Sequence, residues 1–385
     1  MAESLYEFDS GGDTDLVLVT NRLHFQWKRD LLWLGTDEET STDDASAEHE
    51  ESPRELSEDM EIVSEENACE EPAEDASYER FDEPLGEDQS TDGQIRMRLR
   101  VSSRHLILAS RVFRAMLEGP FKEGSVPQSG RRQISASKWD PEALITLMNI
   151  IHGRHREVPR SLSLEALAHF AIVVDYYGCH EVVEVFANMW LKILERNRPS
   201  EYAKDCMLWL LTSWVFSHSD LFKCAMDMTL RQSRKLVVAM DLPIPGEVLS
   251  KIDQKRQEAL TKFFEYVYNL FDSLCDQDHC SLECSCMLLG HLTKELKRNG
   301  ILSPRVTSPF DGHSVKTVRA MVKEFKTLEN WDDDHCVATG LYYRDEQKSV
   351  PTCNARTYLD PVVKSMTEGF HGLKLDDFSC LIDRN

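Results

Sequence analysis

Cysteine and histidine gather in one short stretch of the chain, "CDQDHCSLECSCMLLGH" (275–291). Zinc is usually held by four thiolate or imidazole ligands in a tetrahedron, often supplied as closely spaced pairs. Cys280 and Cys284 are four residues apart and could share one helix face, whereas the pair at 284 and 286 would need a loop. The chemistry that this stretch could support is therefore zinc binding. The candidate ligands are Cys280, Cys284, Cys286, His335 and Cys336.

The simpler interpretation of these cysteines, which we favour, is that they are small buried side chains in helices, with no cofactor. The stretch contains no Cys-x-x-Cys pair, and the eleven cysteines of the chain are scattered. The first residues, "MAESLYEFDSGG", do not resemble a secretory leader. We therefore expect an intracellular protein, cytoplasmic or nuclear or both, rather than a secreted disulfide scaffold.

The sequence motifs of common enzyme classes are missing. There is no Gly-x-Ser-x-Gly elbow, no Gly-x-x-x-x-Gly-Lys phosphate loop and no Gly-x-Gly-x-x-Gly turn. The stretch "HEVVE" (180–184) begins like a zinc-protease helix, but Glu184 stands where the second histidine would be. We predict that the protein is not an enzyme and has no catalytic residues.

Negative charge is concentrated in one tract. Residues 36–93 contain 24 Asp or Glu and only two basic residues, so they carry −22 of the total −23. Such a composition cannot bury enough apolar surface to offset chain entropy, and we expect the tract to be disordered and dispensable for folding. A solubilising spacer is its simplest role. The alternatives are docking to a basic partner such as a histone tail, or phosphorylation at Ser57 or Ser64 by an acid-directed kinase.

The remainder of the chain is close to neutral, which argues against direct nucleic-acid binding because no basic excess is available to face phosphate. Its longest apolar stretch, "MLWLLTSWVF" (207–216), is about half the length of a membrane span. We therefore read this stretch as a buried helix and expect no membrane association.

Hydrophobic periodicity predicts an α+β fold that positions these residues. We expect strands at 14–20, 22–28, 94–101 and 131–136. We expect helices at 104–118, at 141–152 after an Asp140 cap, at 163–178, at 180–197 and at 255–275, with a break at 242–247. The resulting segments are 1–35, the acidic insertion 36–93, 94–198, a helical region 199–303 and a weakly patterned region 304–385.

Two motifs within these elements carry a family resemblance. The first is Leu-x-x-x-Ser-x-x-Phe-x-x-Met after a hydrophobic strand, and the second is Ala-x-x-Val-Asp-x-Tyr-Gly. Their residues are Leu106, Ser110, Phe113 and Met116, and Ala171, Val174, Asp175, Tyr177 and Gly178. Together with the order of strands and helices, they resemble a BTB/POZ domain, most closely the branch common in filamentous fungi. The chain departs from that pattern at Ser102, where the family usually has histidine, and in the acidic insertion between the first two strands.

The resemblance implies a short sheet with helices that mediates protein–protein interaction, and it implies a homodimer. The mostly helical C-terminal region lies outside it. Leu106 and Phe113 should lie in the core, with neighbouring apolar side chains at an interface. The residues that we assign to the interaction and dimer region are Asp15, Leu106, Ile107, Val112 and Met116.

Two alternatives remain for the function. Ligase-recruiting members of the family carry a hydrophobic residue, any residue and then Glu after this helix, and Phe121 and Glu123 match that pattern. The first alternative is therefore a substrate adaptor of a cullin-type ubiquitin ligase, with a cullin scaffold as partner. The second is a zinc-stabilised transcriptional or chromatin-associated regulator. The identity of any other protein partner cannot be read from the residues.

Overall fold

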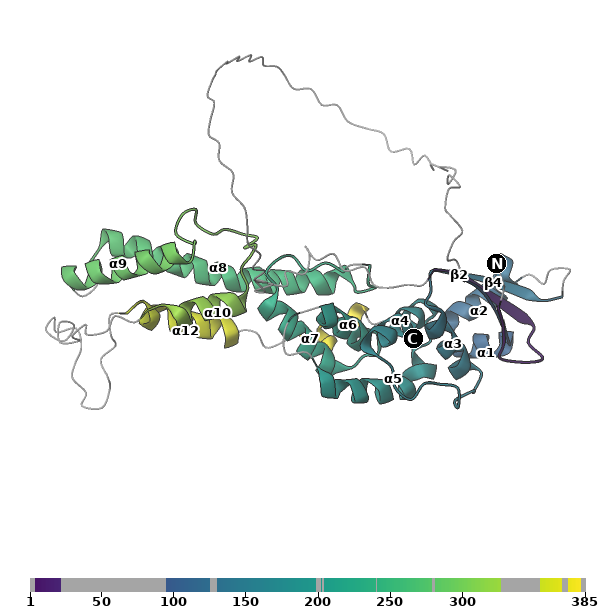
Figure 1. The fold of residues 1–385 in the computed structure, drawn as a ribbon. Coiled ribbons are helices and arrows are strands. Elements are labelled where there is room, and N and C mark those ends of the chain that lie inside the picture. The colour runs from purple at the N-terminus through teal and green to yellow at the C-terminus, as the bar shows by residue number, and fades with distance from the viewer. Residues whose placement is uncertain are drawn as a thin grey trace, which may run out of the picture. The chain divides into compact units, whose positions relative to one another are not determined.

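The structure is a computed structural model, and it describes residues 4–21, 95–124, 130–198, 202, 204–239, 241–278, 281–326, 354–368 and 373–381. Over these ranges the protein is a mixed α+β structure with eleven α-helices and one four-stranded sheet (Figure 1). This confirms the α+β class. The chain divides into two units, residues 1–34 with 93–385, and residues 35–92. The predicted strand at 22–28 and the acidic insertion 36–93 lie outside the described residues.

The sheet combines strands from both sides of the acidic insertion. Its order is β1 (Ser4–Glu7), β3 (Ile95–Val101), β2 (Thr14–Thr20) and β4 (Arg132–Ser137). β2 is antiparallel to β3 and parallel to β4, and β1 is parallel to β3. Because Thr20 pairs with Ile95, residues 21–94 connect two strands that are hydrogen-bonded neighbours.

The alternation of apolar and basic residues in "IRMRLRV" gives β3 one buried face, as predicted. Met97, Leu99 and Val101 are buried, while the arginines between them are partly or fully exposed. Strand β1 was not predicted, because all four of its residues are exposed and it has no apolar alternation. It is held at the sheet edge by its backbone pairing with β3.

The predicted helix at 104–118 is wrong in one respect, because the structure has two helices there, α1 (Ser103–Ala109) and α2 (Arg111–Glu118). The break is Ser110, whose backbone is extended with φ −151° and ψ 128°. Its hydroxyl accepts a hydrogen bond from the backbone N–H of Phe113 at 3.0 Å and so caps α2. Ser110 falls at helical spacing, but it ends one helix and starts the next.

The next three helices, α3 (Pro141–Ile151), α4 (Leu164–Tyr177) and α5 (His180–Leu194), follow their sequence signals. Asp140 caps α3 by accepting from the backbone N–H of Ala143 at 2.8 Å. Gly178 ends α4 in the left-handed conformation with φ 63°, which glycine adopts without steric cost. Ser163 caps α4 by accepting from the N–H of Ala166 at 3.1 Å.

The rest of the described chain is helical. Its helices are α6 (Lys204–Val215), α7 (Ser219–Gln232), α8 (Gly246–Asp276), α9 (Leu282–Arg298), α10 (Val315–Glu324) and α12 (Ala355–Glu368). Short 3-10 turns span Lys122–Gly124, Glu195–Asn197 and Leu375–Leu381. α6 is buried from Cys206 to Val215, as the apolar run predicts, and it packs against α4. Across the ranges described above, no helix is both long and apolar enough to span a membrane.

α10 and α12 lie beyond residue 304; they pack against each other and against α8, and α10 also contacts α7 (Figure 1). A buried charged residue joins α8 to the segment before α10. Arg256 of α8 has a completely buried side chain that donates to Asp253 at 3.0 Å and to the backbone oxygens of Pro309 at 2.8 Å and His313 at 3.3 Å. A buried guanidinium needs such partners, so this contact fixes how the 309–313 segment meets α8.

Candidate interaction surface

The two motifs that carry the family resemblance lie in direct contact. The Ser110 hydroxyl donates to the backbone oxygen of Tyr177, and the rings of Phe113 and Tyr177 stack with centroids 4.3 Å apart. The Tyr177 hydroxyl accepts from the indole N–H of Trp139 at 3.2 Å, and burial raises the pKa of this phenol. These contacts join the α1–α2 corner to the C-terminal end of α4, directly before α5, where the surface described next lies.

Asp13, in the turn before β2, joins the sheet to α1. Its carboxylate accepts from the backbone N–H of Ser103 at 2.8 Å, from the Ser103 hydroxyl at 2.6 Å and from Arg132 at 3.1 Å. Burial by itself raises the pKa of this carboxyl, but the hydrogen bonds from Ser103 and the charge of Arg132 outweigh it and lower the net pKa. Sequence reasoning did not identify Asp13, because its partners lie far along the chain.

His152, at the C-terminal end of α3, supports the start of α1. Its Nε2 accepts the backbone N–H of Ser102 at 3.0 Å, and its Nδ1 lies 2.9 Å from the Met148 carbonyl oxygen. These two contacts require the neutral ring with a proton on Nδ1. Burial is the main reason why the pKa of His152 lies below its ordinary value. Thus a histidine at the end of α3 reaches the backbone of Ser102, fifty positions earlier in the chain.

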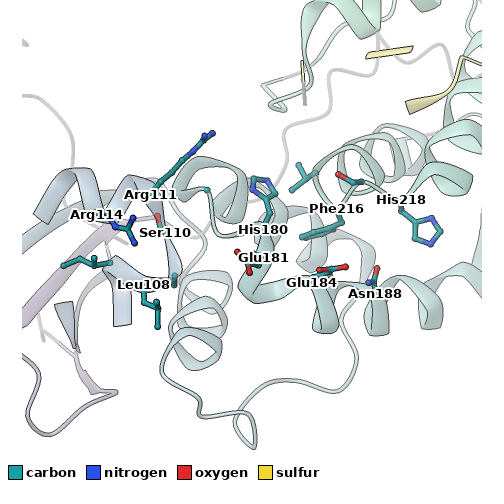
Figure 2. Close-up of a pocket in the computed structure, with 16 residues that line it drawn as sticks. Leu108, Ser110, Arg111, Arg114, His180, Glu181, Glu184, Asn188, Phe216 and His218 are labelled. Carbon is teal, nitrogen blue, oxygen red and sulfur yellow. The ribbon is translucent and has the colours of Figure 1, made fainter. Parts of the chain in front are cut away.

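A groove of about 750 Å³ lies between the α1–α2 corner, α5 and the α6–α7 turn (Figure 2). One end is formed by Leu108, Arg111 and Arg114, and the other by Phe216 and His218. Glu181, Glu184 and Asn188 follow one another along α5 between these ends, because residues three and four apart share a helix face. His180 lies at the centre, with its Nε2 3.5 Å from Asp175.

The two walls of this groove have opposite charge. α2 contributes the exposed guanidinium groups of Arg111 and Arg114, and α5 contributes the exposed carboxylates of Glu181 and Glu184. The mouth also carries apolar surface, because Leu108 at the end of α1 is 81 % exposed. A surface with one anchoring apolar side chain and complementary charges around it is suited to holding another protein.

The residues assigned to the interaction and dimer region differ in how deeply they are buried. Leu106 is completely buried in the core of the single chain, so its side chain has no surface to offer a partner. Ile107, Val112 and Met116 are partly buried and pack against that core with one side. Asp15 is mostly buried on β2, where it faces Arg100 of β3 across 3.6 Å. Of the groove-lining apolar residues on α1, Leu108 extends furthest into solvent.

Phe121 and Glu123 lie just after α2. Phe121 is 54 % exposed, and Glu123 is partly buried in the 3-10 turn Lys122–Gly124. A Cβ added at Gly119 would come within 3.0 Å of the Phe121 ring, so the ring lies directly over this glycine. Phe121 therefore lies exposed at the start of this turn, two residues before Glu123.

The predicted zinc ligands are only partly described. Cys284 and Cys286 both belong to α9, where the first is buried and the second is exposed, so they lie on different faces of one continuous helix. Cys280, His335 and Cys336 lie outside the described residues. Among the residues that the structure does describe, no group of three His, Cys, Asp or Glu side chains is arranged to hold a metal ion.

Comparison of the sequence with protein-family models finds no match, and comparison with curated proteins finds none either.

Proposed function

We propose that this chain is a non-enzymatic protein–protein interaction and dimerisation module of the BTB/POZ type. The observation that carries the proposal is the exposed Leu108 at the corner of α1 and α2, beside a groove with walls of opposite charge. A leucine with four-fifths of its surface in water is ordinary when isolated, but here it adjoins the partly buried Ile107 in a recess.

The order of elements supports the same proposal. An antiparallel pair, β2 and β3, is followed by the helix pair α1 and α2, and β4 then returns parallel to β2. The succession of strand, strand, helical segment and strand is the order on which the family resemblance was based, and the division of the helical segment at Ser110 was not part of it. The contact between Ser110 and Tyr177 adds a physical reason why the two motif segments occur together.

The partner that best fits the groove is a second copy of this chain. In a twofold dimer each surface patch meets the same patch of the other copy, so the patch must be complementary to itself. A patch that carries Arg111 and Arg114 on one side and Glu181 and Glu184 on the other meets this condition, because rotation brings each basic wall toward an acidic one.

The proposal is tested by the molar mass of the full chain in solution. Multi-angle light scattering at several micromolar concentrations should give twice the sequence mass of 44.3 kDa. A carbodiimide couples carboxylates to lysine amines, so crosslinking followed by peptide mass spectrometry should join Lys122, just after α2, to Glu181 or Glu184 of α5 across the two copies. A mass of one chain at every micromolar concentration tested would reject the dimer.

The adaptor function is the second candidate, and the exposed Phe121 favours it. A protruding phenylalanine could fill a pocket on a cullin scaffold while the neighbouring carboxylate of Glu123 accepts hydrogen bonds. Phe121→Ala and Glu123→Ala should then each abolish co-purification of the cullin while the mass of the dimer is unchanged. If the wild-type chain captures no cullin from an extract of its own cells, the interaction module remains and the adaptor role is rejected.

A further inference from the structure

A second hollow, away from the groove, lies between α6 and α7 and has a volume of about 200 Å³. It is lined by Arg198, Cys206, Trp209, Leu221, Cys224, Ala225 and Met228. Three of these seven residues carry sulfur, and the only charged one is Arg198. This composition is unlike a simple gap in a hydrophobic core, because sulfur atoms from two helices face one small space.

Two of the three sulfur atoms are in contact, and the third belongs to the same lining. The Cys206 Sγ lies 3.1 Å from the Met228 Sδ, and Cys206 is completely buried at the α6 side of the hollow. Cys224 precedes Met228 by one turn of α7, so both side chains lie on one helix face. Cys224 is exposed, which leaves the hollow accessible from solvent at the α7 side.

Arg198 places a positive charge beside the cysteine at the entrance. Its Nη1 donates to the Cys224 Sγ at 3.4 Å, and its Nη2 pairs with Glu195 at 3.4 Å. A guanidinium in this position would offset the negative charge of a complex between two thiolates and one monovalent cation.

From this cluster we infer that Cys206, Cys224 and Met228 form a binding site for a monovalent soft metal ion, Cu(I). Thiolate and thioether ligands select Cu(I) over harder cations. Zinc fits less well, because it requires about four ligands and the lining offers two thiols with no His, Asp or Glu. Binding releases the proton of each thiol to solvent and forms two Cu–thiolate bonds and one Cu–thioether bond, with no change in oxidation state.

The test uses the full chain, reduced and kept without oxygen, and the probe is one equivalent of Cu(I) supplied as its acetonitrile complex. The rate at which iodoacetamide alkylates each cysteine is followed by peptide mass spectrometry. Alkylation of Cys224 should slow about tenfold or more, because a metal-bound thiolate is no longer a nucleophile. Cys275 and Cys286, which are also exposed but lie outside the hollow, should keep their rates.

A variant distinguishes Cu(I) bound at this three-residue site from Cu(I) bound to a cysteine alone. Met228→Leu keeps the volume and removes the sulfur, so the protection of Cys224 should require a higher concentration of Cu(I). Met287→Leu on α9 is the matched control, because that methionine is also partly exposed, and it should behave like the wild type. Circular dichroism establishes that both variants are folded.

Two results would overturn the inference. One is protection of Cys275 or Cys286 before Cys224 in the wild type, which would place the preferred site in the cysteine-rich 275–291 stretch. The other is a folded Met228→Leu variant with undiminished protection. If that variant does not fold, the order of protection among the wild-type cysteines still decides the question.

Discussion

Ser103 donates both its backbone N–H and its hydroxyl to the carboxylate of Asp13, ninety positions earlier in the chain. The contact fixes the start of α1 against the turn that precedes β2, with Arg132 of β4 as a third participant. One side chain therefore ties together three segments that meet at the end of the sheet. Hydrogen bonds to an ionised group contribute more to stability than those between neutral groups, so the contact should be measurable.

Asp13→Asn should lower the free energy of unfolding by about 0.5–1 kcal/mol at neutral pH, because the charge that Ser103 and Arg132 contact is lost while water screens the half-exposed carboxylate. The folded-state pKa of Asp13 lies below 3.8, so this contribution is present above pH 3.8 and disappears as the pH falls through the lower folded-state value. Chemical denaturation of both proteins at pH 7 and near pH 3 measures it. Glu118→Gln, at an exposed position on α2, is the control. If Asp13→Asn lowers the free energy of unfolding as much near pH 3 as at pH 7, the ionised carboxylate of Asp13 is not the source of the stability.

His152 should make the fold sensitive to mild acid. Because its folded-state pKa lies below 6.5, the unfolded chain takes up a proton below pH 6.5 while the folded chain does not. Stability should therefore fall as the pH decreases from 6.5 toward the folded-state pKa. His152→Gln keeps an acceptor but cannot titrate, and it should lose less stability over that interval. His313, whose pKa burial also lowers, remains in both proteins, so the difference between them isolates His152. If the free energy of unfolding falls equally steeply with decreasing pH in the wild type and in His152→Gln, the prediction is wrong.

Leu108→Lys should disrupt the proposed dimer without unfolding the chain. The leucine is exposed in the single chain, so its replacement costs little stability, whereas a lysine in place of this apolar anchor should raise the dissociation constant about 30-fold or more. Sedimentation velocity over a concentration series measures the change. Leu282→Lys is the matched control, because that leucine is 61 % exposed at the start of α9, outside the groove. Equal weakening by both variants would point to a general charge effect.

Arg256→Ala should be the most destabilising of these changes, by about 3–5 kcal/mol, because it leaves the buried Asp253 carboxylate without its cationic partner and with only the hydrogen bond from Gln257. It also removes the donors to the backbone oxygens of Pro309 and His313. The control is the neighbouring Lys255→Ala, whose ion pair with Glu258 is solvent-exposed and should contribute less than about 1 kcal/mol. Urea unfolding of the two variants gives the comparison. A similar small loss in both would mean that the 309–313 segment is held by other contacts.

The parts of the fold that follow from local chemistry could be predicted from the sequence. Asp140 with Pro141 sets the start of α3, and Gly178 sets the end of α4, because a cap needs only residues within one turn. The break at Ser110 could not be predicted by spacing, since a serine at a helical position can either continue a helix or cap the next one.

The parts of the site that depend on distant partners were missed for a related reason. Asp13 has the sequence context of an ordinary turn residue, and only folding brings Ser103 and Arg132 to it. The three sulfur atoms of the α6–α7 hollow come from two helices, so no spacing rule relates Cys206 to Met228. The exposed position of Phe121 agrees with local chemistry, because the glycine and proline just before it are typical of a turn.

The position of β2 in the sheet has a consequence for protein synthesis. This strand lies between β3 and β4, and both of its partners are translated after it. On the ribosome, the strand that contains Leu16, Val17 and Leu18 therefore has no partner strand while residues 21–94 are made. This takes about 4–15 s at 5–20 residues per second. An unpaired apolar strand is prone to associate with other nascent chains during such an interval. The tract 36–93, which is made within the same interval, carries a charge of −22, and a high net charge of one sign opposes association between chains that carry it.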